Sequence, residues 1–575
     1  MKKFLIGLLC GLLLSGLALI VTVFSMLRFG ERRPTVPAGA TLMLRLEGSI
    51  PEKAPVEFPL PWLESMRPTT IQETWDLLRK AEADQRVRAV LFQPERVQAG
   101  WGRLQEIREN LLKFRRSGKP LVAFLRNPGA REYYLATAAD RIVMTAEDVL
   151  DLKGLRAELI FLRQTLDKLG VEFEVEHAGK YKDAMDMFTR TSMTKETREV
   201  VDTILDHLQD HLVETIAASR GRTPAQVLAS LNQGPFLAGQ AREHGLVDAL
   251  LFEDEVHQEL AKRLGQSQLR RLSWRDYLRV PAGSLGLEGR SRIALVIGEG
   301  TILRGEMADG LGGDSGLLLS GPFVRLLRQI REDPEIRGVI LRIDSPGGDA
   351  IASDEILREA RLLSRKKPTV ISMGDLAASG GYYIAMTGDP IIAYDSTFTG
   401  SIGVIYGKVN LRGLYDKLGV RKEILTRGRF ADIDSDYTPL TEAGRRKLRE
   451  GIDQVYESFL ARVAEGRRRP TGEIEPLAQG RVWLGAQARH NRLIDELGGL
   501  DRAIELVKQK AKIPPQEKIR LVTYPPRRSI LDQLFGWKVD SVLEARLRSM
   551  VDAGDLRLWA QGGIFRLTPY QVRIR

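Results

Sequence analysis

The sequence predicts an α/β protein built from two tandem copies of one domain, with mostly parallel strands. Strand-like segments alternate with amphipathic helical segments along the chain, which is the pattern of a parallel sheet covered by helices. Segments also recur at a fixed offset: Tyr133 corresponds to Tyr382, 249 positions later. At 575 residues the chain is too long for a single core. A repeat period of this length indicates domain duplication, not a solenoid.

The elements of the two repeats are predicted in the same order. The first repeat covers residues 41–265 and the second covers residues 292–515, with a linker between them and a basic extension over residues 516–575. Each repeat begins with an alternating strand, followed by a buried strand, an amphipathic helix and a further strand. The matching segments are 41–48 with 293–300, 87–91 with 336–340, and 104–114 with 355–364.

The N-terminus carries an almost unbroken apolar run over residues 4–27. About 20 apolar residues span a bilayer as a helix, so this run is long enough. It continues directly into Arg28, Arg32 and Arg33 without the small-residue site typical of a cleaved signal peptide. We therefore predict an uncleaved membrane anchor over residues 1–30 that contacts lipid. Positive charge on both sides of the run leaves its orientation open.

Composition excludes several classes of function. The net charge is +11, but basic residues are scattered among acids and form no stripe with aromatic residues, so nucleic-acid binding is not expected. The only cysteine, Cys10, lies in the apolar run, which rules out a disulfide or cysteine-based metal site within one chain. The six histidines lack metal-binding spacing. We expect neither a metal nor a cofactor.

Each repeat has lost a different half of one site. The second repeat contains Ser379 within a Asp-Leu-Ala-Ala-Ser-Gly-Gly-Tyr-Tyr segment, and the corresponding residue of the first repeat is Ala130. The first repeat contains Lys182 within Gly-Lys-Tyr-Lys-Asp, and its counterpart is Ala431. Reciprocal loss indicates a single Ser/Lys site assembled from both repeats. Lys180 is the alternative lysine in this segment.

The predicted chemistry is nucleophilic catalysis by Ser379. Serine needs a neighbouring base to take its proton. Because no histidine accompanies this motif, we assign the base to Lys182, whose pKa must fall from about 10.4 toward 7–8 through desolvation. Ser401 is placed to orient the lysine through its hydroxyl.

Two glycine elements are expected to stabilise the oxyanion. Gly380 follows the nucleophile at the start of a helix, and Gly347 and Gly348 follow a buried strand in Asp-Ser-Pro-Gly-Gly-Asp. Backbone N–H groups from two such loops form an oxyanion hole, in which each donor is worth about 3 kcal/mol. The first repeat has Glu95-Arg96-Val97 at the place of the second glycine element, so it has lost this loop together with the serine.

These motifs resemble the signal peptide peptidases of the SppA type (protease IV) in their long, duplicated bacterial form. The family's Gly-x-Tyr-Lys pattern falls on Lys182 and its Thr-Gly-Ser-Ile-Gly pattern on Ser401, and the resemblance covers roughly residues 1–512. It implies a ClpP/crotonase-like fold of repeated ββα units in each repeat, and a homotetramer shaped as a bowl. It also implies catalytic domains on the extracytoplasmic side of the inner membrane. The implied substrates are apolar signal peptides left in the membrane after processing.

Two other functions remain open on the sequence. A crotonase-like acyl-CoA enzyme would share the fold and the glycine-built oxyanion hole but would use no serine nucleophile. A non-catalytic membrane scaffold would follow if the serine and the lysine could not meet. The sequence also leaves open whether they meet within one chain or between protomers.

Overall fold

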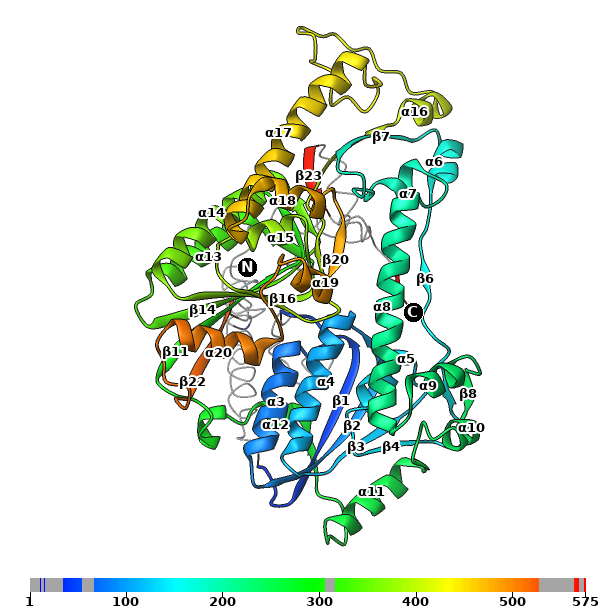
Figure 1. Ribbon diagram of the computed structural model, residues 1–575, viewed down its shortest axis with the longest axis vertical. Coiled ribbons are helices and arrows are strands. Elements are labelled where there is room, and N and C mark those ends of the chain that lie inside the picture. The colour runs from blue at the N-terminus through cyan, green and yellow to red at the C-terminus, as the bar shows by residue number, and fades with distance from the viewer. Residues whose placement is uncertain are drawn as a thin grey trace.

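The computed structural model places most of the chain (Figure 1). It describes residues 35–53, 67–305 and 316–526, the backbone of 563–567 and 573–574, and Gly11 and Ser15 alone. Apart from those two residues, the predicted anchor over residues 1–30 lies outside the described part. Among the residues that are described, no helix combines the length and the apolarity needed to cross a membrane.

The first repeat is built on a six-stranded, fully parallel sheet with the order β10-β1-β2-β3-β4-β9. Central strands are apolar throughout, and β3 is buried at every position, as expected for a strand covered on both faces. The strands are β1 (Ala40–Ser49), β2 (Val87–Gln98), β3 (Leu121–Leu125), β4 (Arg141–Met144), β9 (Ala249–Leu250) and β10 (Arg271–Ser273).

The second repeat follows the same plan. Its sheet has the order β20-β18-β16-β14-β11-β22, and β17 and β21 branch from β16. The order β22-β11-β14-β16 repeats β10-β1-β2-β3, which confirms the predicted duplication of an α/β domain. The strands are β11 (Ser291–Glu299), β14 (Ile336–Ser345), β16 (Thr369–Ala378), β17 (Ile391–Ala393), β18 (Phe398–Gly400), β20 (Val482–Leu484), β21 (Glu496–Leu497) and β22 (Ile519–Tyr524).

Each sheet extends past the boundary that the sequence predicts for its repeat. Strands β10 and β22 lie beyond residues 265 and 515, and each pairs in parallel with the first strand of its own repeat. These edge strands therefore belong to the domains, and not to the linker or the C-terminal extension. β10 has only three residues, too few to show an alternating pattern.

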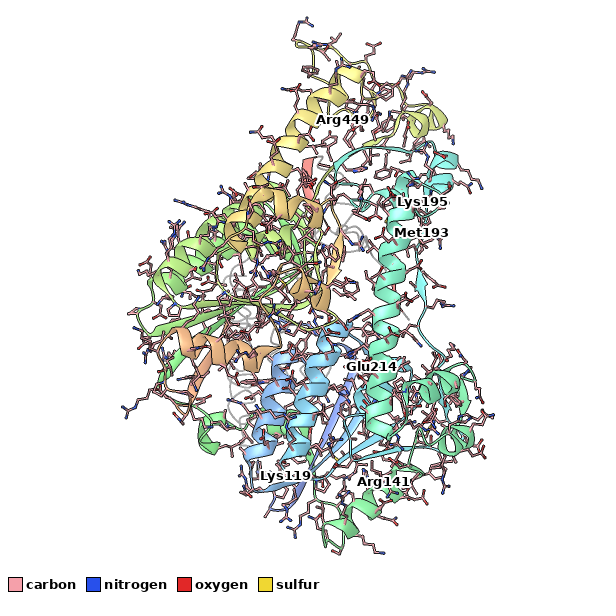
Figure 2. The ribbon with its side chains drawn as sticks, in the orientation of Figure 1. Lys119, Arg141, Met193, Lys195, Glu214 and Arg449 are labelled. Atoms are coloured by element: carbon pink, nitrogen blue, oxygen red, sulfur yellow. The ribbon has the colours of Figure 1, made fainter. Side chains whose placement is uncertain are left out.

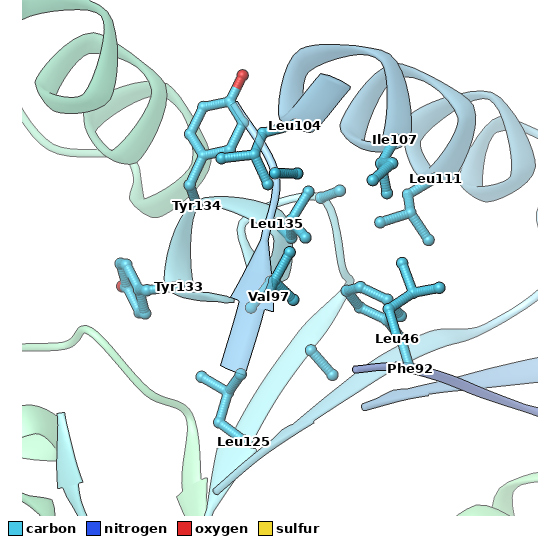
Figure 3. Packing of buried hydrophobic residues seen from close by; sticks show 14 of the residues in the cluster. Leu46, Phe92, Val97, Leu104, Ile107, Leu111, Leu125, Tyr133, Tyr134 and Leu135 are labelled. Atoms are coloured by element: carbon cyan, nitrogen blue, oxygen red, sulfur yellow. The ribbon is translucent and has the colours of Figure 1, made fainter. Parts of the chain in front are cut away.

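Helices cover both faces of the first sheet. On one face, Leu104, Ile107 and Leu111 of α4 pack with Leu46 and Phe92 of the strands (Figure 3). On the other face, α11 packs against β2 and β3. The helices of this repeat are α3 (Ile71–Ala83), α4 (Trp101–Arg116), α5 (Ala130–Ala136), α9 (Pro224–Leu231), α10 (Ala238–Glu243), α11 (Glu253–Arg263) and α12 (Trp274–Leu278). Those of the second are α13 (Ser320–Glu332), α14 (Ala350–Lys366), α15 (Gly380–Ile384), α18 (Thr471–Ile474), α19 (Gly485–His490) and α20 (Leu500–Lys510).

Two long helices and a third sheet join the repeats. Helices α8 (Lys195–Arg220) and α17 (Glu442–Arg467) each have 26 residues and hold equivalent places in their repeats. Figure 2 shows α8 extending from Lys195 near β7 to Glu214 beside the first repeat. Strand β7 (Glu172–Ala178) leaves the first repeat and pairs antiparallel with β19 (Val404–Asn410) of the second along its whole length. Between β7 and its parent domain lie α6 (Arg163–Leu169) and α7 (Asp186–Thr189), and α16 (Arg412–Leu418) follows β19.

The third sheet also contains a strand from the C-terminal extension. Its order is β13-β12-β15-β23-β19-β7, so β23 (Gly563–Leu567) lies between β15 (Gly347–Asp349) and β19 and is antiparallel to both. The remaining pairs are β12 (Thr301–Leu303) with β13 (Leu317–Leu319), β5 (Val149–Leu150) with β8 (Phe236–Leu237), and β6 (Ala157–Glu158) with β24 (Arg573–Ile574). Other residues of the extension beyond 526 lie outside the described part.

Candidate active site

Ser379 lies at the junction between β16 and α15. It is the residue before the helix, with φ 55° and ψ −118°, a left-handed conformation that strains a non-glycine residue. Its backbone N–H donates to Gly400 O at 2.8 Å, and its carbonyl accepts from Tyr383 N at 2.8 Å. These two bonds hold the strained turn, and the Ser379 side chain makes no capping hydrogen bond to the helix that follows.

Lys182 reaches this serine from the first repeat of the same chain. Its Nζ donates to Ser379 Oγ at 2.8 Å, to Ser401 Oγ at 2.9 Å and to Ser401 O at 2.9 Å. All three side chains are fully buried. Lys180, the alternative lysine, is exposed, and its ammonium lies 5.0 Å from the centre of the Tyr181 ring. The structure therefore brings Ser379, Lys182 and Ser401 together and leaves Lys180 outside.

Strand β7, which leads to Lys182, is fixed to the second repeat by two buried glutamates. Glu174 accepts the N–H of Leu440 at 2.9 Å and pairs with Arg445 at 3.1 Å. Glu176 pairs with Arg445 at 2.9 Å and with Arg449 of α17, labelled in Figure 2, at 2.7 Å. Buried carboxylates need such partners. These contacts therefore fix where β7 lies along β19.

A close glycine contact that the sequence analysis missed also sets the place of Lys182. Gly480 has φ +78°, and a Cβ built on it would lie 2.7 Å from both N and Cβ of Lys182. Its N–H donates to Ile402 O at 2.8 Å, and the preceding carbonyl of Gln479 accepts from Tyr181 N at 2.8 Å. One turn thus connects the lysine segment to the segment of Ser401. The only signal in the sequence is that a Gln-Gly pair precedes the closing segment of both repeats.

The two predicted oxyanion elements lie against each other. A Cβ on Gly380 would be 3.0 Å from Gly347 Cα and 3.1 Å from Gly348 N, so the two loops approach too closely for a side chain. A Cβ on Gly348, whose φ is +154°, would lie 2.0 Å from Ile302 O. The N–H of Gly347 donates to Ser345 Oγ at 3.1 Å. This bond gives Gly347 a structural role in the turn.

In the described part of the chain, no group of three or more His, Cys, Asp or Glu side chains is arranged to hold an ion. The arrangement that is present is a hydroxyl in contact with a buried amine, beside a turn of closely packed glycines. Such a site can carry out acyl transfer through a covalent serine intermediate.

Comparison with known proteins agrees with this chemistry. Residues 113–267 and 361–514, one stretch in each repeat, match peptidase family S49. Serine protease SPPA, chloroplastic, of Arabidopsis thaliana is 36% identical over 463 residues, covering 80% of this chain and 68% of that protein. Protease 4 of Salmonella typhi is 33% identical over 455 residues, covering 76% and 71%. Protease 4 of Haemophilus influenzae is 29% identical over 518 residues, covering 85% and 82%.

Among solved structures, a ClpP1 variant from Listeria monocytogenes covers 37% of this chain and 95% of its own, at 12% identity and a TM-score of 0.23. Values this low add nothing to what the fold itself shows. The sequence matches extend over both repeats and confirm the resemblance to the SppA type that the motifs predict. The chain belongs to peptidase family S49.

Proposed function

We propose that this protein is a membrane-anchored serine endopeptidase in which Ser379 and Lys182 form the catalytic dyad. The observation that carries the proposal is the 2.8 Å contact between Lys182 Nζ and Ser379 Oγ, made between the two repeats of one chain. Removal from water disfavours the charged form of an amine, and Lys182 has no exposed surface. An uncharged amine at this place would accept the serine proton. Ser401 is proposed to hold the amine toward Ser379.

The proposed reaction passes through an acyl-enzyme. Ser379 Oγ attacks the carbonyl carbon of a peptide bond while its proton moves to Lys182 Nζ. Lys182 then gives this proton to the departing amine as the peptide bond breaks. Water attacks the acyl-enzyme, Lys182 takes a proton from it, and the serine hydroxyl is restored. We assign the oxyanion donors to the N–H groups of Gly380 and Gly348, because the N–H of Gly347 already donates to Ser345.

The substrate is proposed to bind as an extended strand between β15 and β19. Support comes from β23, which pairs antiparallel with both strands at that place. Pairing through the main chain accepts many sequences, and this fits a peptidase that acts on apolar signal peptides left in a membrane. We propose that residues 1–30 anchor the protein as a single pass in the inner (cytoplasmic) membrane. The catalytic repeats would then lie on the extracytoplasmic side, within reach of such peptides.

We further propose that copies of the chain associate through counterparts of the β7–β19 contact. The offset of 249 residues relates β19 to residues 155–161 and β7 to residues 421–427. These regions expose apolar side chains: Ile160 is 67% exposed, Ile424 41% and Leu425 91%. Strand β6, which lies within 155–161, pairs with β24 along one edge, just as β19 pairs with β23. We propose that the other edge of β6 pairs with a second copy of the chain. Repeated head-to-tail contacts close into a ring, and we propose a homotetramer.

The other functions considered from the sequence find less support. A scaffold would be favoured by a large separation of serine and lysine, whereas their reactive atoms are 2.8 Å apart. A crotonase-like acyl-CoA enzyme would have no use for a strained serine in contact with an amine. A serine-directed acylating reagent should label Ser379 in a peptidase but not in such an acyl-CoA enzyme.

The catalytic proposal is tested with purified full-length protein and an apolar fluorogenic peptide. Ser379→Ala and Lys182→Ala are each expected to abolish cleavage, with the melting temperature and the oligomeric mass unchanged. Lys180→Ala is the matched control and should keep full activity. If Lys182→Ala still cleaves the peptide and Lys180→Ala does not, the base is Lys180 and not Lys182.

The assembly proposal is tested by light scattering. Leu425→Asp introduces a charge into the proposed contact and is expected to reduce the mass from that of a tetramer to that of a monomer. Leu228→Asp, on an exposed leucine of α9 elsewhere in the first repeat, is the control and should leave the mass unchanged. A tetramer in both variants would overturn the proposed contact.

A further inference from the structure

Helix α4 of the first repeat receives its N-terminal cap from the second repeat. Gly100, the residue before the helix, has no side chain with which to cap it. Asp375 of β16 takes this place: its carboxylate accepts from Gly100 N at 2.7 Å and from Arg103 N at 2.6 Å. These are the two backbone donors that a capping box satisfies. A Cβ on Gly100 would lie 2.4 Å from Asp375 Cγ, so only glycine leaves room for the carboxylate.

The equivalent helix of the second repeat caps itself. The counterpart of Gly100 is Asp349, which accepts from Ala352 N at 2.8 Å within its own helix, α14. Asp375 has Arg126 as its counterpart in the first repeat. The repeats therefore differ at a position where a local cap would have sufficed for stability. In the first repeat, the cap is replaced by a contact that reaches the other domain.

Asp375 lies in an irregularity of β16 just before the nucleophile. Ile343 of β14 pairs with Met373, and Ser345 pairs with Ala377, so β16 advances four residues while β14 advances two. Extra residues in one strand re-aim the segment that follows. Here that segment is the turn of Ser379, while the partner strand leads directly to the loop of Gly347 and Gly348.

Arg103 contacts both strands, β14 and β16, at this irregularity. The residue is 8% exposed. Its guanidinium donates to Asp344, the last residue before Ser345, and its Nε lies 3.4 Å from Asp375. Asp344 in turn accepts from Leu376 N at 2.9 Å, which ties the two strands together.

Among the charges around this contact, Arg103 favours an ionised Asp344, whereas burial and the neighbouring carboxylates disfavour it. Burial raises the pKa of Asp344 to about 7, Arg103 opposes that rise, and the carboxylates of Asp375, Glu52 and Glu299 add to it. Arg103 also lies 3.3 Å from Glu299 and 3.4 Å from Glu52. The guanidinium thus supports the carboxylate that accepts the N–H of the irregular strand.

We propose that Arg103 and the N-terminus of α4 are positioning elements of the active site, through which the first repeat fixes the turn of Ser379 relative to the glycine loop. The proposal rests on the proposed peptidase function and adds a second contribution of the first repeat besides the lysine. Asp375 receives both backbone N–H groups of α4, and Asp344 receives the guanidinium. The role proposed for Arg103 and Asp375 is to position Ser379, not to contact the substrate.

The test separates positioning from stability. Asp375→Ala removes the carboxylate and should lower both the melting temperature and kcat, the latter about 10- to 100-fold, with KM less affected. Gly100→Asp combined with Asp375→Ala returns the cap to its own helix, as Asp349 does in the second repeat. This double variant should regain the melting temperature but not kcat. Asp375→Asn keeps the size of the side chain and should also lower kcat. It replaces the alanine variant in the test if that variant fails to fold.

Lys113→Met is the matched control. Lys113 lies on the same helix and forms another contact between the repeats, with Asp501 at 2.8 Å, but far from both loops along α4. Its kcat should stay within about twofold of wild type. Recovery of kcat together with the melting temperature in the double variant, or a normal kcat in folded Asp375→Asn, would overturn the positioning role. Activity that survives Ser379→Ala would instead overturn the peptidase proposal, so the two failures are distinguishable.

Discussion

Replacing Gly480 by alanine is the sharpest perturbation of Lys182, the proposed base, that leaves Lys182 and Ser379 themselves unchanged. The added Cβ would lie 2.7 Å from N and Cβ of Lys182 and 2.8 Å from its Cα, whereas ordinary contacts begin at 3.4 Å. The two backbone segments must therefore separate by about 0.7 Å. An increase of this size in the 2.8 Å distance from Lys182 Nζ to Ser379 Oγ would break the hydrogen bond.

Two effects follow, and they can be measured separately. Misplacement of a reacting group by 1 Å costs on the order of 100-fold in rate, so we expect kcat to fall about 10- to 100-fold. The left-handed conformation, with φ +78°, adds a penalty of about 1–2 kcal/mol for alanine, which should lower the melting temperature. The assay is steady-state cleavage of an apolar fluorogenic peptide, with thermal unfolding of the same preparation.

Gly118→Ala provides the matched control. Gly118 has φ +80°, almost the same conformation, but a Cβ there would meet nothing within 4 Å. This variant should show a similar conformational penalty with kcat unchanged. If Gly480→Ala folds and cleaves peptide within about twofold of wild type, the contact does not set the place of Lys182 and the reasoning is refuted.

Three further predictions concern the lysine, the domain contact and the extension. Ser401→Ala removes one acceptor from Lys182 but keeps the carbonyl, so kcat should fall about tenfold with little change in KM; an unchanged kcat would argue against an orienting role. The hydrogen bond that His207 donates to Asp395 raises the pKa of His207, so this pair stabilises the fold below the ordinary pKa of histidine and loses that effect as pH rises through the raised value. His207→Gln should therefore cost about 1 kcal/mol in urea unfolding at pH 6 and progressively less toward pH 8.5, and a constant cost would contradict this. Ending the chain after residue 526 removes β23 and should raise kcat/KM for short peptides, and a decrease would show that the strand supports the site.

The parts of the site that could be predicted from the sequence are those that differ between matching positions of the two repeats. Ser379 against Ala130 and Lys182 against Ala431 are single positions in register, and their reciprocal loss predicted a shared site, whose side chains the structure places in contact. The order of strands and helices along each repeat, and their mostly parallel pairing, followed from apolar runs that a sheet buried on both faces requires.

Other features depend on pairings that no local pattern records. The contact of β7 with β19 joins segments more than 200 residues apart, and Gly480 resembles any turn glycine until Lys182 packs against it. Arg103 lies just before the helix predicted over residues 104–114, where no local pattern marks it as buried, yet it is buried and paired with Asp344 of the other repeat. The short edge strand β10 likewise lies in the segment that the sequence predicts as the linker.

The strand β23 has a consequence for how the protein would respond to substrate concentration. Because β23 belongs to the same polypeptide as β15 and β19, dilution of the protein does not release it from between them. A flexible tether holds a segment at an effective concentration that reaches the millimolar range when short and falls as the tether lengthens. If peptide binds between β15 and β19 as proposed, it must compete with β23, and its apparent affinity falls in proportion to the fraction of protein in which β23 has left this place. Peptides concentrated in the plane of a membrane would overcome that competition more readily than the same peptides free in solution.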